Sequence, residues 1–276
     1  IKLGGFCMRR SERIALISSM LSKNPNKIIS LNHFSQWLGA AKSSISEDID
    51  IIKTAYKNSG QGEITTLPGA AGGVRYRTKR SVDDINVFLN DLSDTLRDQR
   101  RIIPGGYLYM TDIMFSPEYS SIIGEIFAQI FIDKAPTHVL TVETKGIPIA
   151  LMTAKALNVP MVVARRDSRV TEGPSVGISY VSGSGQKIHN MSLAKRALPE
   201  NSRVLIIDDF MKGGGTAQGM TELVGEFKAQ VVGIAMVMAT AVPKEKLVSD
   251  FTTLLVLEGI DVQKGEINIS INDKLL

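Results

Sequence analysis

Cysteine is almost absent from this chain of 276 residues. Its single cysteine, Cys7, precedes the first methionine, Met8. Disulfide bonds within the chain, thiolate catalysis within the fold and cysteine-ligated zinc are therefore excluded, and a reducing cytoplasm is the natural setting. We expect residues 1–7 to be an expression remnant outside the fold.

Long apolar runs and clustered histidines are missing as well. No apolar stretch reaches the roughly 18 residues that span a bilayer, and no secretory signal follows Met8. We therefore expect a soluble, cytoplasmic protein with no membrane partner. The three histidines, His33, His138 and His189, lack metal-ligand spacing, so the sequence predicts no metal site made by the protein alone.

Charge is spread unevenly along the chain. The net charge is +4 and the isoelectric point is about 9.1. Residues 8–80 carry twelve Lys and Arg against five Asp and Glu, whereas residues 81–276 are net acidic. A basic N-terminal segment suggests a polyanionic partner, although a solvated basic surface would give the same count.

Three short helical patterns follow Met8. The first stops at Asn24-Pro25-Asn26 and the second ends at Gly39. The third begins near Lys42, where Ser44 and Glu47 have the spacing of a capping box. The short gap between the second and third helices is typical of a helix-turn-helix.

Two stretches with a period of two, residues 63–67 and 74–78, then predict a hairpin. Residues 8–80 are therefore predicted to form a winged-helix DNA-binding domain, with a protein–protein module as the open alternative. The candidate DNA-binding residues are Arg9, Arg10, Arg13, Lys42, Ser43, Ser44, Ser46, Arg75 and Arg77.

Residues 81–103 are predicted to form a connecting helix and the turn after it. Apolar residues from Val82 to Leu96 recur in a 3-4-3-4 spacing. Two heptads are too few for a free coiled coil, so this stripe must pack on the chain's own domains or on a second subunit.

Residues 104–276 alternate apolar strands with helical patterns, which predicts a parallel-sheet α/β domain. The predicted strands are 107–114, 138–143, 161–165, 204–208, 231–238 and 253–257, and the predicted helices are 118–132, 148–157 and 218–227. A polar, Gly/Ser-rich insertion at 168–195 predicts a hairpin or a flexible flap. The predicted fold class is thus a winged helix (α+β) followed by an α/β domain.

The chemistry concentrates in residues 204–216. An apolar strand ends in Asp208-Asp209, and Lys212-Gly213-Gly214-Gly215-Thr216 opens a helix. Backbone N–H groups at a helix N-terminus suit a phosphate, whereas carboxylates accept hydrogen bonds from sugar hydroxyls. The combination favours a sugar phosphate over the alternative, an acidic cap and turn with no ligand.

This segment resembles the phosphoribosyl pyrophosphate (PRPP) motif of type I phosphoribosyltransferases. The resemblance implies that Asp208 and Asp209 hold the ribose hydroxyls and that residues 212–216 hold the 5′-phosphate. By the same resemblance, Thr144, Lys145 and Gly146 form a pyrophosphate loop, and Arg165, Arg166 and Arg169 belong to the flap. Lys212 departs from the family's usual loop.

A winged helix joined to a PRPP-binding domain resembles the purine operon regulators (PurR) of Gram-positive bacteria. Met8–Ile14, Ala41–Asp48 and Pro104–Tyr107 are also similar to that family. The resemblance implies a homodimeric regulator that binds DNA upstream of purine biosynthesis and salvage genes. It further implies that PRPP acts as effector, with Mg²⁺ arriving on the ligand, that guanine-nucleotide alarmones compete for the pocket, and that no catalytic residues are needed.

Two other functions use the same residues. The chain could be an active purine phosphoribosyltransferase of the xanthine or adenine type that carries a DNA-binding domain, or a nucleotide-responsive scaffold without a DNA role. The PRPP motif alone does not separate these possibilities from regulation, and the basic N-terminal segment favours regulation.

Overall fold

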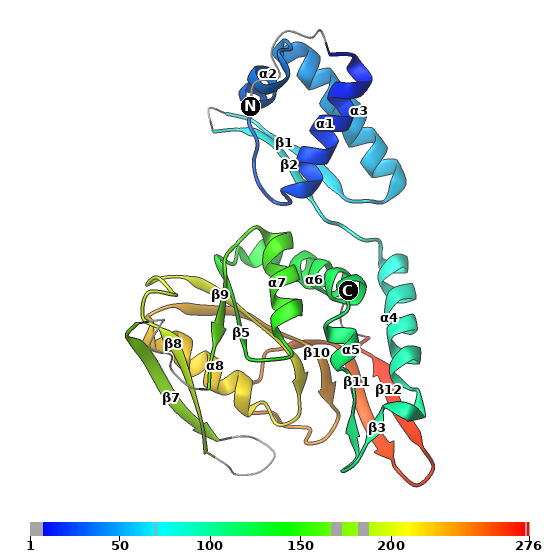
Figure 1. The fold of residues 1–276 in the computed structure, drawn as a ribbon, viewed down its shortest axis with the longest axis vertical. Coiled ribbons are helices and arrows are strands. Elements are labelled where there is room, and N and C mark those ends of the chain that lie inside the picture. The colour runs from blue at the N-terminus through cyan, green and yellow to red at the C-terminus, as the bar shows by residue number, and fades with distance from the viewer. Residues whose placement is uncertain (1–7, 70, 167–172, 182–187, 274, 276) are drawn as a thin grey trace. The chain divides into compact units, whose positions relative to one another are not determined.

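A computed structural model describes residues 8–69, 71–166, 173–181, 188–273 and 275. The chain divides into two compact units (Figure 1). The N-terminal unit comprises residues up to Ser81 together with Ala156–Asn158, and the C-terminal unit comprises Val82–Lys155 and the residues from Val159 onwards. None of the helices in the described ranges is both long enough and apolar enough to cross a membrane.

The N-terminal unit is built from three helices and a hairpin. The elements are α1 (Arg10–Lys23), α2 (Leu31–Leu38), α3 (Lys42–Ser59), β1 (Glu63–Leu67) and β2 (Gly73–Arg77). β1 and β2 pair antiparallel, and Ile29 forms an isolated bridge with Val74 of β2. This is the arrangement of a winged helix, so the predicted fold of this segment is confirmed.

The helices of this unit form because each has one apolar face to bury. Ile17, Phe34, Ile45 and Val74 meet in a single core from which solvent is excluded. The start of α3 differs from the prediction. Ala41 is the N-cap residue and no side chain caps the helix, so Ser44 already lies inside the first turn and the predicted capping box is wrong.

In the described part of the C-terminal unit, six strands form one sheet in the order β12-β11-β10-β9-β5-β6. β12 pairs antiparallel with β11, and the other neighbours are parallel. The strands are β5 (His138–Val142), β6 (Met161–Ala164), β9 (Arg203–Met211), β10 (Gln230–Thr240), β11 (Thr252–Asp261) and β12 (Glu266–Ile271). The predicted α/β sheet is confirmed, and β12 is an antiparallel edge strand that the prediction lacked.

Helices cover both faces of this sheet (Figure 1). Phe131 of α6 lies so close to β10 that a Cβ on Gly233 would come within 2.3 Å of its ring. On the opposite face, α8 packs with Ile206 of β9 and with the predicted hairpin. The elements are α6 (Pro117–Phe131), η2 (Ile132–Lys134), α7 (Ile147–Leu157), α8 (Gly215–Glu226), β7 (Ser175–Val181) and β8 (Ile188–Ala194).

The predicted strand at 107–114 is mostly wrong. β3 (Ile102–Ile103) and β4 (Tyr107–Leu108) pair briefly, and α5 (Thr111–Met114) then forms one helical turn. The Phe115 N–H donates to the Thr111 carbonyl at 3.0 Å. A short apolar run gives no period that separates a strand from a buried helical turn, which explains the error.

The apolar stripe of the connecting segment lies on the chain's own sheet. α4 (Val82–Leu96) packs against β11 and β12, and η1 (Gln99–Arg101) follows it (Figure 1). Leu89 and Leu92 are buried, and the guanidinium of Arg97 donates to the carbonyl of Ile269 at 2.6 Å. The sequence left open whether this helix packs on the chain's own domains or on a second subunit. In the structure its apolar face packs on the C-terminal unit of the same chain.

A buried ion pair joins α1 to α3. Asp48 lies on the apolar face of α3 with no exposed surface, and its carboxylate accepts from Arg13 Nε at 2.8 Å and from Arg10 Nε at 3.1 Å. The side chain of Arg13 is only 15% exposed. Removing one partner of such a pair leaves a buried charge without compensation, so Arg13 is an internal anchor of the winged helix.

We expect Arg13→Met to lower the free energy of unfolding of the N-terminal unit by about 2–4 kcal/mol, because Asp48 keeps only Arg10. Arg9→Met, which removes an exposed charge one turn away, should change it by less than about 0.5 kcal/mol. Trp37, the chain's single tryptophan, lies in α2 and reports this unit selectively in urea titrations followed by fluorescence. Equal midpoints for the two variants would contradict the anchor role.

Candidate functional site

The site forms where two neighbouring strands separate. β9 pairs with β10 as far as Met211, but it pairs with β5 only from Val204 to Ile206. The sequence predicted a strand at 204–208 that ends in the two acids. In the structure β9 continues to Met211, so Asp208 and Asp209 both lie inside it. Their strand is still held on the β10 side, while its β5 side is open. Ligands of open α/β sheets bind at such an edge, beyond the carboxyl ends of the strands.

The loop after β5 closes over the first acid. A Cβ on Gly146 would come within 2.6 Å of Asp208 Oδ1 and within 2.4 Å of Thr141 Oγ1, so only glycine fits there. Thr144 and Lys145 of the same loop are exposed. The structure thus brings the predicted pyrophosphate loop into contact with the predicted ribose acid, although 62 positions separate Gly146 from Asp208 in the sequence.

Asp208 is held in an environment that opposes its ionisation. Its side chain is 6% exposed, and Oδ1 accepts from the Asp209 N–H at 3.0 Å. Burial, and after it the neighbouring charge of Asp209, raises the pKa of the Asp208 carboxyl well above its ordinary range. Among the described residues no cation pairs with Asp208.

The glycine loop leads directly into α8. Gly214 is the N-cap residue with φ of 84°, a left-handed conformation that favours glycine, and α8 starts at Gly215, earlier than the predicted 218. A cavity of about 190 Å³ is lined by Asp208, Met236 and the loop itself. The first N–H groups of a helix lack partners within the helix, so this cavity suits a phosphate group.

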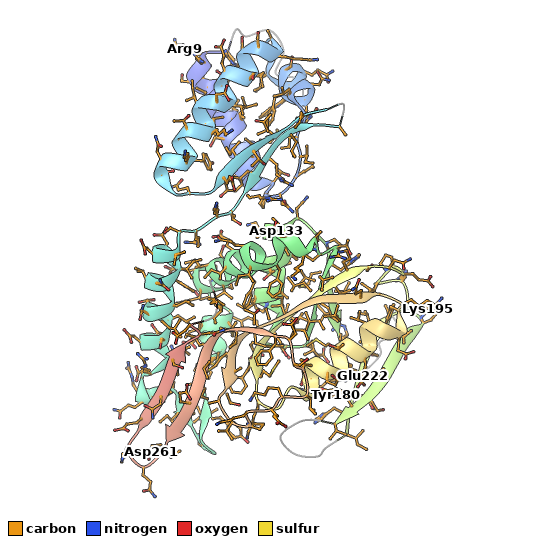
Figure 2. The ribbon with its side chains drawn as sticks, turned by 180° about the vertical axis from the view of Figure 1, so that it is seen from behind. Arg9, Asp133, Tyr180, Lys195, Glu222 and Asp261 are labelled. Atoms are coloured by element: carbon orange, nitrogen blue, oxygen red, sulfur yellow. The ribbon has the colours of Figure 1, made fainter. Side chains whose placement is uncertain are left out.

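The predicted flap region begins next to the Thr144–Gly146 loop. The guanidinium of Arg165 lies 3.6 Å from the carboxylate of Glu143, and the Arg166 N–H donates to Glu143 Oε1 at 2.8 Å. Figure 2 shows Tyr180 of the hairpin beside α8, where a Cβ on Gly219 would lie 2.9 Å from the Tyr180 ring. Arg169 lies outside the described residues.

Glu143 is a site residue that was not expected from the sequence. It directly precedes the predicted Thr144–Gly146 loop and carries the opposite charge to Arg165, which follows the next strand along the chain. The adjacent ends of two parallel strands were the available signal for this pairing.

Some of the candidate DNA-binding residues lie exposed on the start of α3 or on one face of the hairpin, whereas two others form an ion pair within the unit. Lys42, Ser43 and Ser46 are exposed at the start of α3, and Ser44 is half-buried there. Arg75 and Arg77 share one face of the hairpin, opposite the core residues that alternate with them. Arg10 and Arg13, in contrast, bind Asp48, and the clue in the sequence was an acid on the apolar stripe of α3.

Among the described residues, no group of three or more His, Cys, Asp and Glu side chains is arranged to hold a metal ion. The carboxylates of Asp208 and Asp209 are oxygen ligands of the kind that Mg²⁺ prefers. They would complete a Mg²⁺ site only together with oxygens of a bound phosphate.

We expect Asp208→Asn to stabilise the unliganded protein in alkaline buffer. The folded-state pKa of Asp208 lies above its unfolded value, so the wild type loses stability as the pH rises through that interval, whereas the amide has no charge to desolvate. Each kcal/mol gained should raise Tm by about 2–4 °C, and the gain should vanish towards pH of about 4.

Thermal unfolding over a pH series measures this difference, with Asp133→Asn as the exposed control. If Tm varies with pH in parallel for wild type and Asp208→Asn, the pKa of Asp208 is not raised in the folded state and the prediction is wrong.

Comparison with solved structures identifies the fold of the C-terminal unit. Adenine phosphoribosyltransferase from Saccharomyces cerevisiae superposes with a TM-score of 0.53 at 21% identity, covering 61% of this chain and 98% of that chain. At this identity the similarity shows the fold alone. It is a type I phosphoribosyltransferase fold, as the sequence predicted.

Comparison with family models and curated proteins covers both units. The family described as "Bacterial purine repressor, N-terminal" matches residues 9–78, and "Phosphoribosyl transferase domain" matches residues 112–273. The purine biosynthesis transcriptional repressor PurR of Bacillus subtilis is 45% identical over 261 residues, which are 95% of this chain and 92% of that protein. The purine biosynthesis transcriptional activator PurR of Lactococcus lactis strain IL1403 is 40% identical over 272 residues, 97% of this chain and 100% of that protein. With both units matched in one order over nearly the full length, this chain belongs to the bacterial PurR family.

Proposed function

We propose that this chain is a transcription regulator of purine biosynthesis and salvage genes. It binds DNA as a homodimer through the N-terminal unit and senses PRPP with Mg²⁺ through the C-terminal unit. The observation that carries the proposal is the convergence of Asp208, the glycine loop and Gly146 at one open edge of the sheet. The two related regulators of Bacillus and Lactococcus support the role in transcription.

Each group of PRPP has a suitable partner at this edge. Asp208 and Asp209 accept hydrogen bonds from the ribose hydroxyls, and the N–H groups of residues 212–216 hold the 5′-phosphate. Thr144, Lys145 and Gly146 hold the pyrophosphate, with Arg165 and Arg166 as nearby cations. The resemblance to phosphoribosyltransferases adds Arg169, which lies outside the described residues. Mg²⁺ bound to pyrophosphate and ribose oxygens reduces the repulsion between the ligand and the two acids. Guanine-nucleotide alarmones, which also carry pyrophosphate groups on a ribose, compete for this pocket.

Control of DNA binding requires that PRPP bind one arrangement of the dimer better than another. α4 is the first element of the C-terminal unit and directly follows the winged helix in the chain. A shift of this helix against β11 and β12 would change the separation of the two winged helices, and hence the half-site spacing on DNA.

We expect Asp208→Ala combined with Asp209→Ala to abolish the PRPP response and to leave DNA binding without effector within about twofold, because both acids belong to the C-terminal unit and none of their contacts involves a candidate DNA-binding residue. Fluorescence anisotropy of a labelled duplex from upstream of purine genes, titrated with and without PRPP and Mg²⁺, measures both quantities. The matched control removes two exposed acids, Asp133 and Glu222, which Figure 2 labels.

The same titration gives the direction of control. Release of a specific complex by PRPP indicates a repressor. An unchanged complex indicates an activator that switches after binding, or a different effector. Loss of DNA binding together with the PRPP response in the double variant would refute the separation of roles, provided that its fold is intact by circular dichroism.

We expect Arg75→Ala combined with Arg77→Ala to weaken binding of specific and random duplexes alike and to reduce the slope of log K against log salt by about 1–2, because each lost phosphate contact contributes about 0.9. Lys134→Ala combined with Lys264→Ala removes the same formal charge from the C-terminal unit and should leave the slope unchanged. An unaltered slope in the arginine variant would place the DNA contacts elsewhere on the N-terminal unit. Failure of the wild type to bind either duplex would refute DNA binding itself.

The same acids and loop would also serve a phosphoribosyltransferase. Catalysis would additionally need a pocket that selects a purine ring and a flap that excludes water. Pyrophosphate release from PRPP with xanthine, guanine, hypoxanthine or adenine separates the two functions. Turnover at the rate of typical enzymes, roughly 1–1000 per second, would show that the C-terminal unit is an enzyme and would refute a purely sensing role.

A further inference from the structure

The loop between β10 and β11, residues 241–251, packs against the glycine loop (Figure 1). The Leu247 N–H donates to the carbonyl of Gly213 at 3.0 Å. A Cβ on Gly214 would lie 3.1 Å from the Leu247 nitrogen, so the two backbones are in close contact. This loop is therefore a second wall around the residues that are predicted to hold the 5′-phosphate.

Lys246 of this loop reaches the first residue of the glycine loop. Its ammonium donates to the carbonyl of Lys212 at 2.5 Å, to the carbonyl of Thr240 at 2.8 Å and to the Thr240 hydroxyl at 3.2 Å. The Thr240 hydroxyl in turn donates to the carbonyl of Val242 at 2.7 Å. One lysine thus joins the end of β10 to the start of the glycine loop.

These contacts set the orientation of two peptide groups. In a trans peptide the C=O and the N–H point in opposite directions. The carbonyl of Lys212 is turned towards Lys246, so the N–H of Gly213 points away from it. The carbonyl of Gly213 is turned towards Leu247, so the N–H of Gly214 points away in the same manner. Both carbonyls are thereby bound by the 241–251 loop and are unavailable to repel an anion.

Lys246 also brings a positive charge to this wall. Among the described residues no carboxylate lies within ion-pair distance of its ammonium, and its three hydrogen-bond acceptors are carbonyl or hydroxyl oxygens. Partial burial lowers the pKa of Lys246, in keeping with an ammonium that lacks an anionic partner. Lys212, in contrast, has an exposed side chain.

We propose that Lys246 is a positioning residue of the phosphate cradle. It holds the Lys212–Gly213 peptide so that the N–H groups of the glycine loop face the 5′-phosphate, and its charge favours that phosphate through the loop. The proposal rests on the proposed function, because it assumes that this cavity takes the 5′-phosphate of a phosphorylated ribose. It specifies which half of the ligand Lys246 serves: the 5′-phosphate and not the pyrophosphate, which is assigned to the Thr144–Gly146 loop.

Calorimetric titration of the full chain with ribose 5-phosphate and, separately, with Mg²⁺-pyrophosphate tests this assignment. We expect Lys246→Met to weaken ribose 5-phosphate binding by about tenfold or more, the loss typical of a charge-assisted hydrogen bond, and to leave pyrophosphate binding within about twofold. Lys244→Met removes the same charge from an exposed position in the same loop and should change both affinities by less than about twofold. Lys246→Arg restores a cationic donor and should return ribose 5-phosphate affinity to within about threefold of wild type.

Three outcomes would overturn the assignment: equal effects of Lys246→Met and Lys244→Met, equal loss of both ligands in Lys246→Met, or no recovery in Lys246→Arg. If Lys246→Met does not fold, Thr240→Val removes one acceptor and keeps the charge. It should then weaken ribose 5-phosphate alone by about threefold, and wild-type affinity would overturn the role. A wild-type protein that binds neither ligand refutes the proposed function itself, which is a result distinct from all of these.

Discussion

The separation of β5 from β9 after Ile206 is the constraint on which the rest of the C-terminal unit depends. Up to that point both edges of β9 are paired, and its side chains belong to the core. Beyond it, one edge is open, and Asp208 lies there against Gly146 without solvent and without a cation among the described residues. A carboxylate in that position opposes folding, which is the cost expected of a binding residue and supports the ligand that we propose for it.

Much of this architecture could be predicted from local patterns. The apolar periods of α1, α2 and α4 and the alternation of β1 and β2 determine their type without reference to the rest of the chain. The predictions failed where a short apolar segment fits two structures, as at Thr111–Met114. They also failed where a boundary depends on a neighbour. β9 extends to Met211 because β10 continues to pair with it, and the residues of β9 alone do not show this.

The site could likewise be predicted where its residues are contiguous in the sequence. Asp208, Asp209 and the glycine loop are contiguous, and their chemistry can be inferred from their order in the chain. Glu143, Lys246 and the pair of Arg13 with Asp48 could not be found in this way, because each acts on a residue far away in the sequence. Only the fold brings such partners together. Two of these residues had a signal in the sequence. An acid on an apolar helix face, as at Asp48, requires a cation from elsewhere, and Glu143 and Arg165 carry opposite charges at the ends of consecutive predicted strands.

Asp208 and Lys246 have opposite charges but similar environments beside the glycine loop. Burial raises the pKa of Asp208 and lowers the pKa of Lys246, and neither has an oppositely charged partner among the described residues. The Asp208 carboxylate can accept hydrogen bonds from the ribose hydroxyls of the proposed ligand. Lys246 already uses its three N–H groups within the protein, so it offers the 5′-phosphate its charge and not a hydrogen bond. Under the proposed function, the stability that the empty protein loses by leaving these two charges unpaired is recovered when the ligand binds. The response to PRPP would then depend on how far this gain differs between the two arrangements of the dimer.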